Sequence, residues 1–422
     1  MPESKGIPPF KAFMDGVQAA KHADYAATPM AKVAHEDAFA EMRAHILKLY
    51  DNVEVTHSFE DANGSIFDCI PVAHQPSLKG TSGPIPKAPD LPIHEAPAHA
   101  GPKEERKDTL IASPMGPDRM DRHGNVMHCP EGTVPMRRIT LENMVRFGTL
   151  KDFFRKGPGE VRPPISSPSG GIAPGAPPTH RWAHAYQNVN NGGGHSFLNI
   201  WDPAIGANQI FSLSQHWYVA GSGGGLQTAE CGWQVYPQMY GNTKPVFFIY
   251  YTADDYNQTG CYNLTCNAFV HTAGSFTPGM AFSSWSTPGG PQYIVELAYW
   301  HTGGRWWLYV NGTSGSNAIG YYPDSVYKGG ALTQHATEID YGGETVGTTT
   351  FPPMGSGQFA KAGWQKAAYQ RTIGYWTPQG GSMINANLTP SQAWPNCYTA
   401  VVQMLGDPWY ETLWFGGPGG VC

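Results

Sequence analysis

Short apolar stretches with alternating side chains recur from residue 180 to the C-terminus and predict β-strands. They are rich in aromatic and β-branched residues, which favour the pleated, half-buried setting of a strand. The predicted strands cover 209–220, 226–236, 245–252, 267–272, 292–300, 305–310, 319–322, 337–345 and 365–375. His-Thr-Gly-Gly at 301–304 fits a hairpin turn. Helical spacing is missing from this half of the sequence, so we expect an all-β fold, an antiparallel β-sandwich of two curved sheets.

Helical spacing is confined to the first part of the chain. Apolar residues recur every three or four positions over 35–50 and again over 140–156, so each stretch predicts a helix. The stretch 74–122 is rich in Pro, His and Lys, which indicates extended or poorly ordered chain. We therefore expect an α/β or mixed region over residues 1–156.

A linker separates the two parts. Residues 157–179 contain seven prolines among many glycines. Proline removes ladder hydrogen bonds and glycine loosens the backbone, so this stretch is an exposed target for cleavage. The sequence thus predicts three parts: 1–156, the linker 157–179, and a β-sandwich domain over 180–422.

Charged residues are scarce in the predicted sandwich. Residues 180–422 contain 7 Lys and Arg and 11 Asp and Glu, and the whole chain has a net charge of −6. We therefore expect no nucleic-acid partner. No apolar run is long enough for a membrane span, so we expect no membrane partner either. The first residues, Met-Pro-Glu-Ser-Lys-Gly, lack the basic and apolar regions of a signal peptide.

Two glutamates stand out in this weakly charged background. Strand alternation puts Glu230 on the same face as Gly232, and Glu344 on the same face as Gly342. A glycine lets a ligand approach the backbone closely, so both faces suit the floor of a cleft. Cys231 lies on the opposite, apolar face, which we expect to be core. A carboxylate in such surroundings is costly to bury without a partner or a chemical role.

Two carboxyl groups that face one cleft can activate water for hydrolysis. One, ionised, takes a proton from the water, and the other donates a proton to the carbonyl oxygen or the leaving nitrogen. Like charges held close together resist double ionisation, so such a pair works best in acid. The residues alone leave other roles open: a solvated rim position, the rival glutamate Glu296, a two-carboxylate glycosidase, or a carbohydrate-binding sandwich whose glutamates are merely polar contacts.

The cysteines indicate an oxidising compartment. Seven is an odd number, so at least one thiol has no intrachain partner. The candidate disulfides are Cys261 with Cys266, Cys397 with Cys422, and Cys69 with Cys129, the last left open. Because no Cys-x-x-Cys occurs, metal binding by these residues is disfavoured. We expect disulfides and hence a secreted protein.

Other candidate residues are histidines and aromatics. His180 and His184 lie four apart, but no His-Glu-x-x-His accompanies them, so we expect a surface loop there rather than a zinc site. Trp233 and Trp306 are core, cleft wall or both by composition alone. Exposed Trp beside Tyr would suit proline rings or sugar rings equally.

At these same positions the chain resembles the neprosin family, prolyl endopeptidases classed as glutamic peptidases. The matching motifs are Phe-Ser-Leu-Ser-Gln at 211–215, Glu-Cys-Gly-Trp-Gln-Val-Tyr-Pro at 230–237, Gly-Cys-Tyr-Asn-Leu-Thr-Cys at 260–266, Arg-Trp-Trp-Leu at 305–308, Gly-Tyr-Tyr-Pro at 320–323, Tyr-Gly-Gly-Glu at 341–344 and Met-Gly-Ser-Gly at 354–357. The first part also matches, at 68–76 and 129–138, and in the family this region is a propeptide.

The resemblance implies a β-sandwich peptidase with Glu230 and Glu344 as its catalytic pair, and it selects Glu344 over Glu296. It implies no metal ion and no organic cofactor. It also supports the disulfides Cys261–Cys266 and Cys397–Cys422. We expect a substrate cleft lined by Gln234, Trp233, Tyr341 and Trp306. The expected function is a secreted, acid-acting glutamic endopeptidase that cleaves after proline and is made as a zymogen. Its partners would be proline-rich proteins or peptides and its own propeptide, and we expect a monomer.

Overall fold

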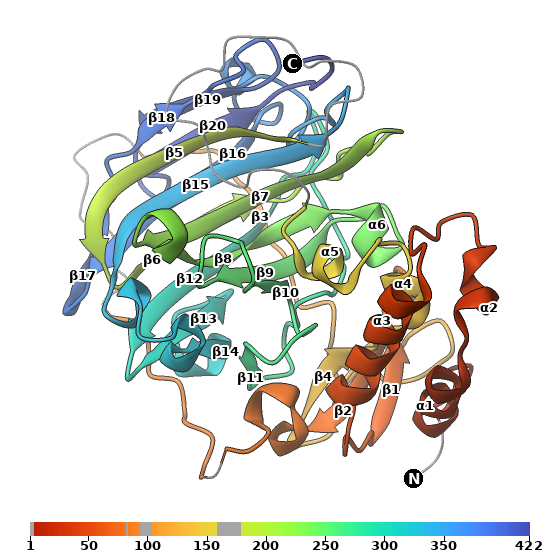
Figure 1. Cartoon of the computed structure of the whole chain (residues 1–422). Helices are drawn as coiled ribbons and strands as arrows, with labels where there is room; N and C mark the ends of the chain where they lie inside the picture. The colour runs from red at the N-terminus through yellow and green to blue at the C-terminus, as the bar shows by residue number, and fades with distance from the viewer. Residues whose placement is uncertain (1–3, 82, 93–102, 158–178) are drawn as a thin grey trace.

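Two large β-sheets dominate the computed structural model, which describes residues 4–81, 83–92, 103–157 and 179–422. The sheets curve and pack face to face, and the helices gather at one end of the sandwich (Figure 1). We call the described residues up to 157 the N-terminal region and those from 179 the C-terminal region. All strand pairs within the two large sheets are antiparallel except the pair between β3 and β12. The all-β prediction for the second part is confirmed.

The first large sheet has seven described strands in the order β10-β9-β8-β7-β15-β5-β18. Their bounds are β5 Thr179–Asn191, β7 Gln209–Ala220, β8 Gln227–Val235, β9 Val246–Thr252, β10 Cys261–Tyr262, β15 Ala336–Gly347 and β18 Thr389–Ser391. The long strands β7, β15 and β5 lie at its centre, so residues distant in sequence meet there. This sheet holds both predicted glutamates.

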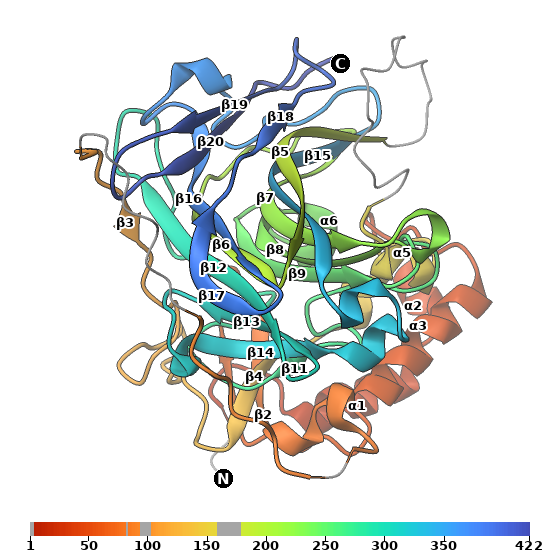
Figure 2. The same cartoon turned by 90° about the vertical axis from the view of Figure 1, so that its left-hand side faces the viewer.

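The second large sheet has ten described strands, eight of them in the order β11-β14-β13-β12-β6-β16-β20-β19, with β17 paired to β16 and β3 to β12. Their bounds are β3 Thr109–Leu110, β6 Gly193–Asn199, β11 Val270–His271, β12 Tyr293–Thr302, β13 Arg305–Val310, β14 Ala318–Pro323, β16 Ala368–Thr377, β17 Gly380–Asn385, β19 Thr399–Met404 and β20 Glu411–Gly416. Figure 2 shows β3 along the outer side of this sheet.

Most of the predicted strands form close to their predicted bounds. The stretch 209–220 is strand β7 and 305–310 is strand β13, without an end shifted. The turn between β12 and β13 contains Gly303 and Gly304, both with positive φ (58° and 72°), as a tight hairpin of this type requires. The sequence patterns missed β5 and β6, which begin the sandwich, and also β10 and the strands β17 to β20.

The N-terminal region is a small mixed α/β unit. Its helices are α1 Phe10–Ala19, α2 His22–Ala26, α3 Glu36–Leu49, α4 Leu141–Met144 and α5 Leu150–Phe154, and its small sheet contains β1 His57–Glu60, β2 Ile66–Pro71 and β4 Thr133–Arg137. In the C-terminal region one short α-helix, α6 Pro237–Tyr240, is described. The described 3₁₀ turns are η1 Val72–His74, η2 Pro76–Leu78, η3 Gly223–Gly225, η4 Gly315–Asn317, η5 Asp324–Tyr327, η6 Ala331–Thr333 and η7 Ala360–Ala362.

The first helix prediction is confirmed and the second is wrong as a single helix. In α3 the apolar side chains at helical spacing are buried, as predicted. The stretch 140–156 instead forms α4 and α5. The chain breaks between them because Gly148 is followed by Thr149, whose extended backbone and side-chain acceptor for the Asp152 amide cap a new helix.

Polar contacts join the N-terminal region to the C-terminal region. The side chain of Gln75 hydrogen-bonds both backbone groups of His271, at 2.8 Å each. Arg137 donates to the Tyr240 carbonyl at 3.1 Å and lies over the Tyr240 ring. Because these contacts sit beside a shared apolar core, the two regions fold as neighbours rather than as separated units.

Three disulfides join described cysteines: Cys69–Cys129, Cys261–Cys266 and Cys397–Cys422. All three candidate pairs are thereby confirmed, including the one left open. Of the cysteines that the structure describes, Cys231 alone forms no disulfide, and it is buried as predicted. None of the described helices has the length and apolar character needed to traverse a lipid bilayer. Residues 158–178 of the predicted linker lie outside the described residues.

Candidate active site

Glu230 on β8 and Glu344 on β15 approach each other across the intervening strand β7. Gln215 on β7 lies between them, since its two register partners are Gly232 and Gly342. A Cβ atom on Gly232 would come within 2.0 Å of the Ser214 carbonyl oxygen. The glycines are thus required for close contact between neighbouring strands, a different reason from the ligand approach that the sequence suggested.

The ammonium group of Lys156, from the end of the N-terminal region, occupies the space between these side chains. Its Nζ hydrogen-bonds Oε2 of Glu230, lies 3.0 Å from Oε2 of Glu344, and donates to Oε1 of Gln215 at 3.0 Å. The Lys156 side chain is only 2% exposed and both carboxylates are fully buried. Burial alone would lower the pKa of Lys156, but the two carboxylates outweigh it and raise that pKa. The lysine is therefore held charged.

Glu344 is supported by donors on two strands. His180 Nδ1 forms a hydrogen bond with its Oε1, and Gln215 Nε2 donates to its Oε2 at 3.3 Å. Burial would raise the pKa of Glu344, but the charge of Lys156 and the contact with His180 lower it below its ordinary value. Glu344 is thus held ionised in this arrangement.

Glu230 is held by two hydroxyl groups. Thr228 Oγ1 and Tyr256 OH each donate to its Oε1 at 2.7 Å. Both donors converge on the same oxygen, which leaves Oε2 turned toward Lys156 and Glu344. The indole ring of Trp217 borders this space, 6.0 Å from Lys156 Nζ. The two carboxylates therefore point one oxygen each toward the position that Lys156 now fills.

A second acidic cluster lies on the same face of β15. His184 Nδ1 contacts both oxygens of Asp340, at 2.8 and 2.9 Å. Burial raises the pKa of Asp340 to about 6, with His184 acting against it, and burial together with the charge of Asp340 raises the pKa of Glu338 to about 7. Within the described residues, no three His, Cys, Asp or Glu side chains gather as a metal ion would require.

A neutral network lies behind the two glutamates, between the sheets. His216 Nε2 is 2.8 Å from the Cys231 sulfur, and His216 Nδ1 is 2.8 Å from Tyr218 OH. Burial, with a smaller effect of His195, lowers the pKa of His216 to about 3, and burial raises the pKa of Cys231 far above its usual value. The groups directly behind the pair thus stay uncharged in mild acid.

Three of the four residues expected at the substrate cleft lie in the core instead. Trp233 and Tyr341 alternate with the glutamates along β8 and β15 and therefore face the opposite sheet; Trp306 belongs to that sheet. Each is fully buried, and each polar group is satisfied by a backbone carbonyl. Only Gln234 shares the face of Glu230, where it hydrogen-bonds Tyr262 and Tyr240.

Glu296, the rival glutamate, lies in the other sheet and pairs with His195 at 3.0 Å. The expected surface loop around His180 and His184 is wrong, because both histidines are buried on β5. The sequence analysis also missed Gln215, Tyr256 and Lys156. Strand alternation on β7 could have found Gln215, whereas the other two reach the site only through the folding of loops.

Part of the face beside Glu230 remains open. A cavity of about 460 Å³ is lined by Phe154 and Arg155 of the N-terminal region and by Tyr250, Tyr256 and Gly260 of the C-terminal region. Tyr250 OH donates to the Phe154 carbonyl at 3.1 Å. The C-terminal end of α5 and Arg155 therefore lie along an aromatic surface next to the glutamates.

Comparisons with known proteins fall on the same part of the chain. The model of the Neprosin family matches residues 208–418, half of the chain, including both glutamates. Among solved structures, scytalido-glutamic peptidase with a transition-state analogue inhibitor is 8% identical and covers 56% of this chain and 98% of its own, with a TM-score of 0.32. SCP-B, an Eqolisin-family peptidase in complex with the tripeptide Ala-Ile-His, is 8% identical and covers 56% of this chain and 98% of its own, with a TM-score of 0.30. The kappa-carrageenase from Pseudoalteromonas carrageenovora is 8% identical and covers 56% of this chain and 67% of its own, with a TM-score of 0.20. Scores this low say nothing about the site.

The strand-built fold and the family match together define the class of protein, a peptidase of the glutamic type. The chain belongs to the Neprosin family. Its substrates are accordingly peptides or proteins.

Proposed function

We propose that this protein is the precursor of a secreted, acid-acting endopeptidase that uses Glu230 and Glu344 to cleave after proline. The observation that carries the proposal is the convergence of both carboxylates and Gln215 on one nitrogen atom of Lys156. Once Lys156 leaves, a water molecule in its place can hydrogen-bond the same three side chains. That water is the nucleophile for direct attack on the peptide carbonyl, without an acyl-enzyme.

The surroundings of the two glutamates suggest their roles. Glu344, whose pKa is lowered by Lys156 and also by its contact with His180, acts as the general base that takes a proton from the water. Glu230 carries the shared proton on Oε2 and donates it to the leaving nitrogen. Gln215 Oε1, which accepts from Lys156 in the intact chain, would accept a hydrogen bond from the water and hold it for attack. Two close carboxyls retain one proton only in acid, so activity is expected at low pH.

Preference for proline rests on the aromatic side chains beside the pair. Trp217 and Tyr256 border the space around Lys156, and an aromatic face suits the flat, apolar ring of proline. A substrate residue in the place of Lys156 would contact these rings. The disulfides support export to an oxidising compartment.

The position of Lys156 supports the proposal of a precursor state. The N-terminal region fills the proposed position of the water with the ammonium group of Lys156, which has no bond to hydrolyse. The next residue, Gly157, lies against His180, and His180 is hydrogen-bonded to Glu344. Gly157 and Thr179, the described residues on either side of 158–178, therefore both lie near the site, since Thr179 directly precedes His180. We propose that acid protonates the glutamates, weakens their hold on Lys156, and allows cleavage within 157–179.

The test is cleavage of a proline-rich protein between pH 2 and 8 after acid treatment of the purified chain, with the cuts mapped by mass spectrometry. Glu230→Gln and Glu344→Gln should each abolish cutting. Glu296→Gln is the matched control, because this buried glutamate also pairs with a histidine but in the other sheet. Absence of cutting by the processed wild type at every pH would refute the peptidase; cuts unrelated to proline would refute the specificity alone. Maturation of Glu230→Gln by itself would refute self-processing.

A further inference from the structure

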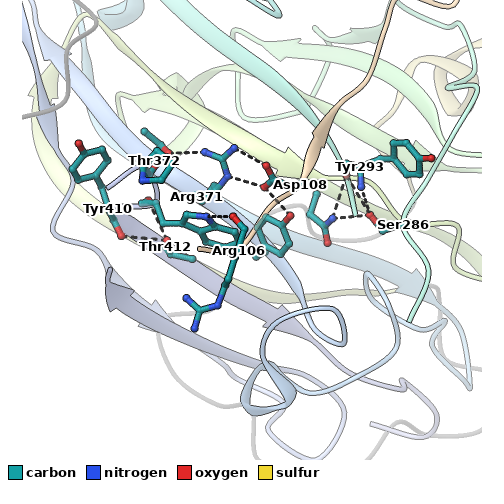
Figure 3. A network of polar contacts seen from close by, with 12 residues as sticks. Arg106, Asp108, Ser286, Tyr293, Arg371, Thr372, Tyr410 and Thr412 are labelled. Carbon is teal, nitrogen blue, oxygen red and sulfur yellow. Dashed lines mark hydrogen bonds and ion pairs between the residues drawn. The ribbon is translucent and has the colours of Figure 1, made fainter. Parts of the chain in front are cut away.

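An extended arm, residues 103–111, crosses the outer face of the ten-stranded sheet. Its side chains alternate: Glu104, Arg106 and Asp108 turn toward the sheet, whereas Glu105 and Lys107 face solvent. Figure 3 shows Asp108 joined to Arg371 of β16, with Arg106 in the same network of polar contacts. The arm is sequence-distant from the sheet it covers, so its contacts are tertiary and not a local turn.

Asp108 is bound by a fork of donors. Arg371 Nε and Nη2 donate to its two carboxylate oxygens at 2.8 Å each, and Tyr369 OH donates to Oδ2 at 2.9 Å. The Arg371 and Asp108 side chains are only 9% and 6% exposed. Arg371 is held in place by the Phe197 ring, 4.1 Å from its guanidinium carbon. A buried, bidentate pair of this kind selects a carboxylate by geometry as well as by charge.

Arg106 lies on two tryptophans of the same face. Its guanidinium carbon is 5.6 Å from the Trp409 ring and 5.9 Å from the Trp414 ring. Trp409 Nε1 donates to the Arg106 carbonyl at 3.3 Å, and the Glu104 amide donates to the Asp407 carbonyl at 2.8 Å. A cation two residues before the aspartate thus meets aromatic faces that favour positive charge.

The end of the arm adds a strand to the sheet. Thr109 and Ile111 donate their amides to the carbonyls of Gln292 and Ile294 at 2.8 Å each. β13 pairs with β12 from Leu297 onward, and β3 takes the same edge at the start of β12. Backbone pairing gives affinity for an extended chain whatever its sequence, and the side-chain contacts add selectivity.

We propose that this strip of the C-terminal region is a peptide-binding site separate from the glutamates. We call it the Arg371 strip: Arg371, Tyr369, Trp409, Trp414 and the β12 edge at Gln292–Ile294. Its ligand is an extended segment with a basic residue two positions before an acidic one. In the intact chain the arm fills the strip at the high effective concentration of a tethered segment.

Departure of the N-terminal region would leave the Arg371 guanidinium and the β12 edge without these partners. Exposed strand edges and unpaired buried donors favour a new ligand. The occupant after cleavage is then a segment of a protein substrate that carries the same pattern, which would hold that substrate on the enzyme away from the scissile bond. Only this last step rests on the proposed peptidase function; binding of peptide to the strip does not.

The test uses the full chain with a weakened arm, Arg106→Ala with Asp108→Ala, and a fluorescent peptide of residues 103–112. Anisotropy at neutral pH should show binding to this variant and at least tenfold weaker binding to the wild type, whose own arm competes. A peptide with Asp108→Asn should bind roughly tenfold or more weakly, because it loses charge-assisted bonds. A peptide with Lys107→Ala, changed on the solvent side, should bind unchanged.

A second variant separates ligand recognition from a folding defect. Adding Arg371→Lys to the weakened-arm chain keeps the positive charge and removes the bidentate hydrogen bonds to the carboxylate. It should therefore weaken binding of the wild-type peptide and leave binding of the Asp108→Asn peptide unchanged. The proposal is overturned if the wild-type peptide fails to bind the weakened-arm chain or binds the wild-type chain equally well. It is also overturned if the wild-type and Asp108→Asn peptides bind the weakened-arm chain with equal affinity. Each of these results leaves the peptidase proposal standing, since no cleavage is measured.

Discussion

The ammonium nitrogen of Lys156 lies 3.0 Å from Oε2 of Glu344 and hydrogen-bonds Glu230 at the same time. One cation from the N-terminal region thus pairs with two carboxylates that strands β8 and β15 bring together. Without it, two negative charges would face each other in a buried site, which is unfavourable unless one of them takes up a proton. The lysine therefore stabilises the intact chain through its ion pairs with the two proposed catalytic carboxylates.

Lys156→Met should destabilise the intact chain most at neutral pH. The pKa of Glu344 is lowered in the folded chain, so its stabilising contribution is present above its ordinary pKa of 4.5 and is lost as the pH falls through the lowered value. Removing one partner of a buried ion pair costs about 3–5 kcal/mol. The melting temperature should fall clearly at pH 7 and much less at pH 3.

The matched control is Lys151→Met, an exposed lysine of α5, which should leave the melting temperature unchanged at both values of pH. An equal decrease for Lys156→Met at pH 7 and pH 3 would contradict the proposed charge pairing. It would indicate that the lysine contributes only its packing.

His180→Leu should move the acid limb of the pH–activity profile of the processed enzyme. His180 contributes to the lowered pKa of Glu344, so its loss should raise that pKa. A general base with a higher pKa is ionised only at higher pH, so the acid limb of the kcat/KM profile should move to higher pH. The measurement is kcat/KM against pH on a proline-containing fluorogenic peptide.

His184→Leu is the control, because His184 pairs with Asp340 on the same face rather than with either glutamate. It should leave the acid limb in place. If His180→Leu lowers activity by the same factor at every pH, the proposed effect of His180 on the pKa of the general base is refuted.

Strand alternation predicted which side chains share a face with Glu230, whereas the family resemblance was needed to select Glu344 over Glu296 as its partner. The period of two placed Glu230 and Cys231 on opposite faces of β8, and the structure confirms that Cys231 is core. The same alternation also predicted that Trp233 and Glu230 lie on opposite faces of β8. Trp233 was nonetheless expected at the cleft because aromatic content alone does not distinguish a core side chain from a cleft wall. In a sandwich, the face toward the second sheet takes the large rings.

The remaining parts of the site depend on contacts that no local pattern encodes. Lys156 was predicted as the last residue of one long helix. It instead follows the short helix α5, and its position depends on the break at Gly148 and Thr149. His180 directly follows a proline-rich stretch and reads as loop, yet pairing with β15 makes it the start of a central strand. The positions of such residues depend on contacts with parts of the chain that are distant in sequence, and the neighbouring residues in the sequence do not reveal them.

His216→Gln should flatten the acid dependence of stability. The pKa of His216 is lowered to about 3 by burial, so the unfolded chain binds a proton between pH 6.5 and 3 that the folded chain does not. Stability is therefore lost as the pH falls through this range, by up to about 1.4 kcal/mol per pH unit. Urea unfolding at pH 4, 5, 6 and 7 should show a smaller slope in the variant.

The variant should also be less stable at pH 7, because the contacts of His216 with Cys231 and Tyr218 are disturbed. His128→Gln, at an exposed position, controls for the general loss of a histidine and should keep the wild-type slope. A His216→Gln slope equal to that of the wild type would show that His216 is protonated in the folded protein.

Glu338→Gln should stabilise the protein in alkali and not in acid. Burial and the charge of Asp340 raise the pKa of Glu338 to about 7. The folded chain therefore keeps a proton that the unfolded chain releases above about 4.5, and stability declines as the pH rises from 4.5 to 7. A neutral glutamine avoids this cost, so the free energy of unfolding at pH 8 should rise by roughly 1–3 kcal/mol, with no gain at pH 4. Glu54→Gln, on an exposed side chain, should give no gain at either pH; a Glu338→Gln gain of equal size at both would show that packing, not charge, is responsible.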